Sequence, residues 1–170
     1  EEGDDGVSRL FSEGSGSFGA NPHVYLIWAL ECLAWLPDSF SQAVLLLAKL
    51  ATKHPDVKTT NPIGSLIGIF RLVLSQTTAS QKQKDDILEI LVDRYSAIAK
   101  RILFANIPSR GKSILDSNYR PRSLEEDQHS YEKEIDREQY WNNVNRTVDI
   151  LLSEPYGLQE LADLVKEIPN

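Results

Sequence analysis

The amino-acid sequence predicts an all-α fold of about seven helices in antiparallel pairs, either an α-solenoid of the HEAT or armadillo kind or an irregular helical bundle. Three observations predict this class. Apolar residues recur at the i, i+3, i+4, i+7 spacing of helices. Prolines and capping residues mark successive helix starts, and no segment alternates convincingly as a strand does. No clean repeat period chooses between the two architectures.

The first helix is expected to begin at Asn21-Pro22, where an N-cap residue precedes a proline at the first helical position. From Val24 to Leu36 the chain carries a single charge, Glu31, and a helix that is apolar on all sides is buried on most of them. A buried lone carboxylate is costly. We therefore expect Glu31 to pair with Arg71 or Lys49 or to lie on an exposed strip, with a functional acid as the alternative.

Prolines and polar residues bound the next two helices. Pro37 is expected to end the first helix, and Asp38 or Ser39 to cap a second helix that runs to about His54. A third helix, with another Asn-Pro start, is expected over residues 61–74. The short break between the first two helices predicts an antiparallel hairpin.

Four more helices are expected along the rest of the chain. Ser80 and Gln83 form a capping-box pattern, followed by two helices that end before Pro108. An Asp-x-x-Gln pattern at 136–139 begins a further helix that ends at Pro155, and a last helix follows it. Helical spacing places these apolar residues, among others, in the core: Trp28, Trp35, Phe40, Ile87, Leu91, Tyr95, Ile102, Trp141, Val144, Val148, Leu151, Leu152, Leu158 and Val165.

Composition divides the chain into a lead-in and one helical domain. Residues 1–21 are acidic and rich in Gly and Ser, which is typical of a flexible entry segment, and residues 22–170 form the domain. Residues 108–135 show no sustained periodicity, and a loop of that length indicates a functional or mobile excursion. The formal charge of −7 is uneven, because residues 56–120 carry a net +4 and residues 121–170 a net −7.

A group of basic residues beside the long loop is the candidate site. Arginine forks and loop amides can hold phosphate or an acidic protein surface. The competing interpretation, which we favour, is a solvated basic face neutralised by the acidic section that follows it. The candidate residues for binding an anion or a partner are Lys100, Arg101, Arg110, Lys112, Arg120 and Arg122.

No motif for catalysis, a metal or a cofactor has its expected context. Gly14–Gly19 matches G-x-G-x-x-G, but the strands of a dinucleotide site are missing, so a flexible loop is favoured. His23, His54 and His129 fall in no zinc pattern, and His54 is placed to interact with the dipole at a helix C-terminus. We therefore expect no enzyme activity in this segment, no cofactor and no metal.

Location is predicted from what the chain contains. The single cysteine, Cys32, agrees with a reducing cytoplasm, and no secretory signal is visible. The longest apolar stretch falls short of the roughly 20 residues that a membrane span needs, so we expect no membrane association. Because the chain holds no methionine and opens on an acidic run, we expect it to be a piece of a longer protein.

Five short stretches carry a family resemblance. They are Leu10-Phe11 with the Gly-rich stretch after it, Trp28–Trp35 (WALECLAW) followed by Pro37-Asp38, Ser65–Phe70 (SLIGIF), Gln76-Thr77, and Tyr140-Trp141. In this order they resemble the helical region of large, poorly characterised bacterial multidomain proteins. In those proteins a nucleoside-triphosphatase or other effector module precedes a long helical region, and some are similar to STAND-type or sirtuin-linked NTPases of antiviral defence.

The resemblance implies context and architecture but carries no functional residue onto this sequence. Two segments depart from the pattern. In the family, the stretch before the 'SL' motif is rich in Gly and Asn and contains an Arg-Pro, and residues 58–62 lack these features. The family's stretch after the 'IF' motif contains tryptophan, and residues 71–74 do not.

We expect a non-catalytic helical scaffold or sensor segment of a larger bacterial cytosolic protein, which binds a protein partner or other domains of its parent chain. The alternative is a regulatory domain that binds a nucleotide or nucleic acid through the basic middle section. Nucleic acid is not favoured, because the chain as a whole is acidic.

Overall fold

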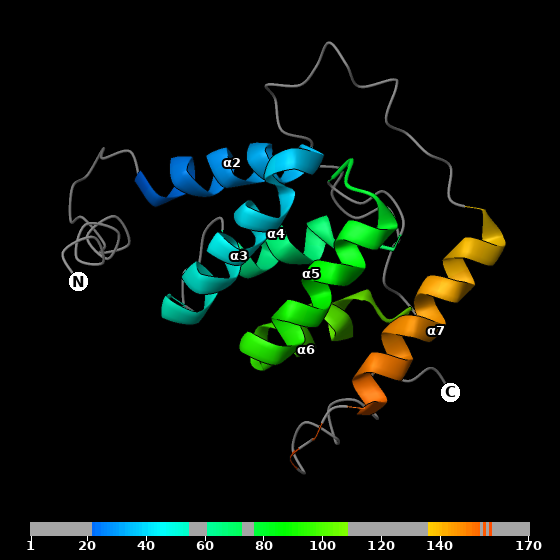
Figure 1. Cartoon of the computed structure of the whole chain (residues 1–170). Coiled ribbons are helices and arrows are strands. Elements are labelled where there is room, and N and C mark those ends of the chain that lie inside the picture. The colour runs from blue at the N-terminus through cyan, green and yellow to red at the C-terminus, as the bar shows by residue number, and fades with distance from the viewer. Residues whose placement is uncertain are drawn as a thin grey trace.

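The computed structural model describes residues 22–54, 61–72, 77–108 and 136–153, together with Pro155 and Gly157. Within these ranges the chain is all-helical, as predicted, and contains no strand. The helices, shown in Figure 1, are α2 (Pro22–Trp35), α3 (Pro37–Lys53), α4 (Pro62–Ile69), α5 (Gln81–Arg94), α6 (Ser96–Asn106) and α7 (Arg137–Ser153). The predicted lead-in, most of the predicted long loop and the predicted last helix lie outside the described residues. No helix in the described ranges is both long enough and apolar enough to cross a membrane.

The first helix ends just before Pro37, as predicted, and Pro37 also begins the next helix. α3 starts at this proline, and the N-cap before it is Leu36, with extended backbone angles of φ −88° and ψ 131°. Proline suits a first helical position because its φ is fixed and its missing N–H would have no helical acceptor there. The prediction that Asp38 or Ser39 caps this helix is therefore wrong. The Ser39 hydroxyl instead donates to the Leu33 carbonyl at 2.6 Å, and so closes the end of α2.

The Asn-Pro start of α4 is confirmed, but the helix is shorter than predicted. The Asn61 Oδ1 accepts a 2.7 Å hydrogen bond from the Gly64 N–H, as an N-cap does. α4 ends at Ile69, and the Phe70 N–H donates to the Leu66 carbonyl in the closing turn. The apolar spacing beyond this turn had predicted a helix to residue 74.

The starts of α5 and α7 are capped as the sequence predicts. Ser80 and Gln83 form a reciprocal capping box, in which each side chain bonds the backbone N–H of the other residue. At α7 the Asp136 Oδ1 accepts from the Gln139 N–H at 2.7 Å. These bonds satisfy N–H groups that have no acceptor within the first turn of a helix.

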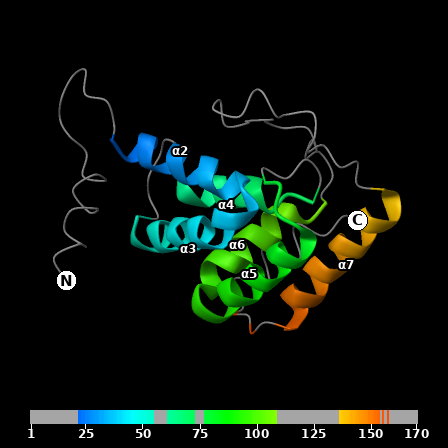
Figure 2. The same cartoon turned by 45° about the horizontal axis from the view of Figure 1, so that its top comes forward.

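α3 and α6 occupy the centre of the bundle. α3 contacts α2, α4, α5 and α6, whereas α6 contacts α3, α4, α5 and α7. Figure 1 and Figure 2 both place α7 on the side of the bundle away from α2. Each almost fully buried apolar side chain stabilises the fold by about 1.5–3 kcal/mol relative to exposure. The largest of them are Ile27, Phe40, Val44, Leu47, Leu66, Ile69, Ile87, Leu91, Ile102 and Leu151.

Three residues predicted for the core are exposed. Trp28, Trp141 and Leu152 expose 41%, 48% and 67% of their surface. α7 buries only a narrow stripe that includes Val144 and Leu151. Because a helix at the edge of a bundle is covered on one side only, apolar residues off that stripe remain outside, whatever their hydropathy.

The end of α2 is held by the segment that leads into α5. The Thr77 hydroxyl donates to the Ala34 carbonyl at 2.7 Å. The Thr78 hydroxyl and N–H both donate to the Trp35 carbonyl, at 2.7 and 2.9 Å. The last carbonyls of a helix have no N–H donor within the helix. These bonds supply donors for them and join the α2–α3 hairpin to α5.

Candidate interaction surface

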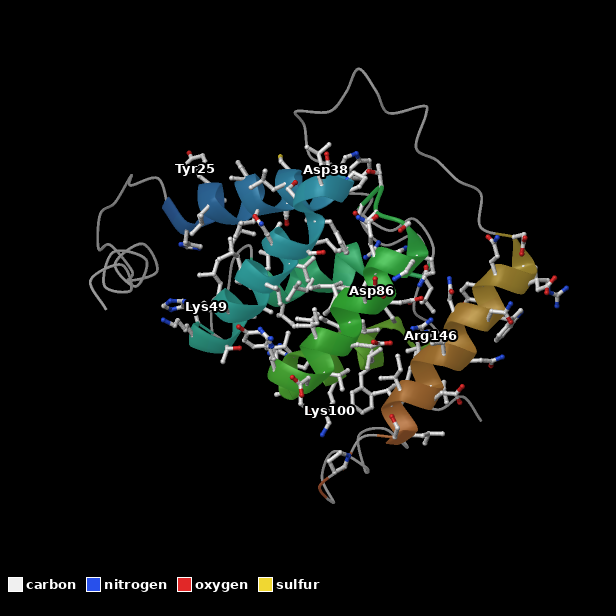
Figure 3. The ribbon with its side chains drawn as sticks, viewed as in Figure 1. Tyr25, Asp38, Lys49, Asp86, Lys100 and Arg146 are labelled. Atoms are coloured by element: carbon white, nitrogen blue, oxygen red, sulfur yellow. The ribbon has the colours of Figure 1, made fainter. Side chains whose placement is uncertain are left out.

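The face of α2 that points away from α3 is apolar and exposed. Tyr25, Trp28, Leu33 and Leu36 expose 57%, 41%, 45% and 44% of their surface, and Ala29 lies exposed among them. Figure 3 shows Tyr25 on this outer side. The spacing i, i+3, i+4, i+8, i+11 places the five residues along one side of the helix and the turn that follows it. We call this set of five residues the outer stripe.

The opposite face of the same helix anchors it. Ile27, Leu30 and Ala34 are buried, with exposures of 0%, 4% and 0%, and α2 packs on α3 and α4. The helix therefore has two apolar faces, and the described part of the chain covers one of them. Contiguous exposed apolar surface is typical of a site for a protein partner.

Two aromatic rings form the start of the outer stripe. Tyr25 and Trp28 meet edge to face, with ring centroids 5.7 Å apart and an interplanar angle of 89°. This geometry is favourable for aromatic pairs, and both rings lie on the surface. Trp and Tyr are among the residues that most often dominate the binding energy of an interface.

Glu31 does not interrupt the outer stripe, because it is engaged on another side of α2. Its carboxylate accepts a 2.7 Å hydrogen bond from the Ser65 hydroxyl on α4. Burial raises the pKa of Glu31 above its ordinary value, and the bond from Ser65 offsets part of that rise. The sequence predicts a cation, Arg71 or Lys49, as the partner of Glu31, whereas the structure shows a hydrogen bond from a hydroxyl group. Lys49 lies exposed on α3 (Figure 3).

The predicted basic site is described only in part. Lys100 is 9% exposed, and its Nζ donates to the Pro155 carbonyl at 2.7 Å, so its charge serves a contact inside the fold. Its neighbour Arg101 is exposed. The other four members lie outside the described residues, so the basic site as a whole stays a prediction. These four are Arg110, Lys112, Arg120 and Arg122.

His54 is the C-cap residue of α3, so it lies at the C-terminus of a helix as predicted. Burial, followed by the positive charges of Lys53 and His23, lowers the pKa of His54 below its ordinary value. Its interaction with the helix dipole stays a prediction. Cys32 is half-buried, and His129 and the Gly14–Gly19 motif lie outside the described residues.

Sequence reasoning missed the outer stripe because it placed Trp28 in the core. The signal was nonetheless present. α2 has two separate sets of apolar residues at helical spacing, one through Ile27 and Leu30 and one through Tyr25 and Trp28. A helix packed on one side of a bundle can bury only one such set, and the second set is then a candidate surface.

Comparison with known proteins identifies no relative of this chain. No family model, no curated protein and no solved structure matches the chain. The resemblance to the helical region of bacterial multidomain proteins therefore stays an expectation from the sequence.

Proposed function

We propose that this chain is a non-catalytic helical scaffold or sensor segment of a larger bacterial cytosolic protein, and that its outer stripe binds an amphipathic helix of a protein partner. The observation that carries the proposal is the exposed apolar face of α2, with Tyr25 and Trp28 stacked edge to face on it. An interface of this kind consists of an apolar centre with aromatic anchors and a polar rim.

The length and charge of the outer stripe define its occupant. Tyr25 and Leu36 are eleven positions apart, which corresponds to about 16 Å along a helix at ~1.5 Å per residue. A partner helix of about three turns matches that length. The five side chains carry no charge, so the complementary face of the partner is uncharged as well.

The area of the outer stripe favours a partner helix over a second copy of this chain. A large aromatic side chain offers about 150–250 Å², and about half of that is exposed at Tyr25 and Trp28. The whole stripe therefore offers a few hundred Å², whereas a stable dimer buries about 800 Å² per partner. We therefore propose a single partner helix laid along the outer stripe, as in helix-in-groove recognition, as its occupant.

The arrangement of helices supports the scaffold role. α2 and α3 are joined by a single residue, Leu36, and α5 and α6 by a single residue, Tyr95. In an α-solenoid, which is the architecture we propose, each helix pair buries its face against a neighbouring pair. Stacked pairs of this kind form an extended surface that other proteins bind, and the outer stripe would be part of that surface.

The alternative function is a regulatory domain that holds a nucleotide or nucleic acid through the basic middle section. Its tests are the salt dependence of binding and the double variant Arg110→Ala with Lys112→Ala. If that variant leaves every interaction unchanged, the basic section is not the contact surface.

A site-specific photo-crosslinker tests the proposal. p-Benzoylphenylalanine replaces Trp28 in the parent protein, in the cells that produce it, and mass spectrometry maps the crosslinked peptides. The matched control places the same group at Leu152, which is 67% exposed on α7. We expect Trp28 adducts within one helical segment of another protein and no such adduct from position 152.

Loss of the adduct in a Tyr25→Asp background, with an unchanged circular dichroism spectrum, supports the assignment to the outer stripe. The proposal is overturned if the adducts lie within this chain, including residues 1–21, or between two copies of it. It is also overturned if the two crosslinker positions capture the same peptides or position 28 captures none.

A further inference from the structure

α7 buries a narrower face than the central helix of the same length. α3 and α7 each contain 17 residues, but α3 buries seven of them and α7 three. The three are Val144, Thr147 and Leu151, and the Thr147 hydroxyl donates to the Asn143 carbonyl of its own helix at 2.9 Å. Because the hydrophobic effect grows with the apolar area that is buried, it holds α7 less firmly than α3.

The contact between α7 and the bundle also contains a cavity. Its volume is about 40 Å³, and one water needs about 10–15 Å³ of such space. Its lining includes the apolar residues Leu88, Leu103 and Ile150 and the polar residues Asp85 and Asn143. Tightly packed interiors contain few voids larger than a water molecule. The contact beneath α7 is therefore packed less closely than the core around α3.

An ion pair joins the middle of α7 to α5. The Arg146 Nη1 donates to the Asp85 Oδ2 at 2.6 Å, and Figure 3 shows Arg146 on the side of α7 toward α5. The Asp85 side chain is 15% exposed, and its Oδ1 accepts from the Gln81 Nε2 at 2.9 Å. The carboxylate is thus fixed on α5 and partly shielded, and salt screens such a pair less than an exposed one.

We propose that α7 is a detachable helix, which undocks as a unit while α2 to α6 remain folded, and that the Arg146–Asp85 ion pair controls how often it undocks. Proteins open locally in cooperative units, and the units with the fewest buried apolar contacts open most readily. In α7 that small apolar contact is combined with a specific ion pair, so loss of one charged group shifts the balance between the docked and undocked forms.

Undocking would uncover an apolar face of α5 and α6. Leu88 and Leu103 line the cavity and are 9% and 3% exposed while α7 is docked. Docking of α7 thus controls access to this face. The device is independent of the outer stripe, since Figure 1 and Figure 2 both place α7 on the side of the bundle away from α2.

Hydrogen exchange of the whole chain under native conditions, resolved by residue, tests the proposal. We expect the amides of residues 144–151 in α7 to exchange at least about tenfold faster than those of residues 43–51 in α3, after correction for intrinsic rates, because α7 opens without global unfolding. Thr77→Val separates the two processes. It removes a bond to Ala34 that both forms of α7 retain, so it should speed exchange in α3 and leave exchange in α7 unchanged.

Arg146→Gln tests the role of the ion pair. We expect exchange in α7 to rise about three- to tenfold, since the pair lies between an exposed and a buried one. Lys82→Gln is the matched control, because Lys82 forms an ion pair of the same 2.6 Å length with Asp86 within α5, and it should leave α7 unchanged. Adding Asp85→Asn to Arg146→Gln should produce little further increase, because the two groups act as one pair.

Equal exchange rates in α3 and α7 would overturn the proposal, because they would show that α7 opens only when the whole bundle unfolds. It is also overturned if Thr77→Val speeds exchange in α7 as much as in α3. An effect of Arg146→Gln no larger than that of Lys82→Gln overturns the role of the ion pair.

Discussion

The hydroxyl of Thr77 donates a 2.7 Å hydrogen bond to the backbone carbonyl of Ala34, which lies 43 residues earlier in the chain. The same hydroxyl accepts a bond from the Ala79 N–H at 3.1 Å. Thr77 is 8% exposed, so solvent has little access to replace either bond. One side chain thus closes the end of α2 and shapes the turn that leads into α5.

Replacing Thr77 by valine keeps the shape of the side chain but removes its hydrogen bonds. It leaves the Ala34 carbonyl and the Ala79 N–H without this partner, and a buried polar group left unsatisfied costs about 1–3 kcal/mol. We expect the free energy of unfolding in urea to fall by about that amount. Thr52→Val is the control, because Thr52 is exposed and its hydroxyl bonds the Ala48 carbonyl of its own helix. Equal losses in the two variants would show that the long-range bond contributes nothing.

Glu31 should make the protein less stable as the pH rises. Its pKa in the folded state lies above the ordinary value of 4.5, so the folded state binds the proton more tightly than the unfolded state does. Its contribution to stability is therefore full below pH 4.5 and lost as the pH rises through the folded pKa. Glu31→Gln keeps an acceptor for Ser65, and it should unfold at higher urea than the parent at neutral pH.

Urea unfolding at a series of pH values checks this prediction for Glu31. The difference between parent and Glu31→Gln should shrink as the pH falls toward 4.5, the ordinary pKa. Glu138→Gln, at an exposed position in the first turn of α7, is the control. A constant difference across the range would contradict a titration at Glu31.

His54 should have the opposite effect on the pH dependence. Burial, with the charges of Lys53 and His23, lowers its pKa below 6.5, so the folded state binds this proton less tightly than the unfolded state. Its contribution is present above pH 6.5 and lost as the pH falls through the folded pKa. His54→Gln should lose less stability than the parent on acidification below 6.5. Thermal melts at a series of pH values compare His54 with His54→Gln, both in a Glu31→Gln background, so that only the histidine titrates differently. Melting temperatures that fall in parallel with pH would refute the prediction.

The ammonium of Lys100 links α6 to the chain just after α7, through the Pro155 carbonyl. Lys100→Met keeps the long stem but removes the donor. We expect faster hydrogen exchange toward the end of α7 and a loss of about 1–3 kcal/mol in the free energy of unfolding. Arg101→Met is the matched control, because its side chain is exposed on the same helix. If hydrogen exchange in α7 is equally fast in the two variants, the contact with Pro155 does not hold this helix.

Helix starts were predictable because capping acts between residues three positions apart. Asn61 with Gly64, Ser80 with Gln83, and Asp136 with Gln139 each form the predicted bond. The start of α3 was not found, because the chain doubles back over a single residue and Pro37 fits both the end of one helix and the first turn of the next.

The candidate surface was less predictable than the helices that carry it. The predicted basic site rested on charge alone, and charge does not reveal which ammonium group is used inside the fold. Lys100 is engaged with Pro155, 55 positions away, whereas Arg101 beside it is exposed. The outer stripe went unrecognised, because apolar side chains on opposite faces of α2 look alike in the sequence.

The sequence by itself determined the all-helical class, the capped starts of α4, α5 and α7, and the apolar character of α2. Local propensity, proline geometry and capping depend on residues within one turn, so they can be read directly from the chain. Only the tertiary structure decided that Trp28 faces outward and that Glu31 meets Ser65, 34 positions away. Exposure and long-range partners depend on which helix packs against which face, and that depends on the arrangement of the whole bundle.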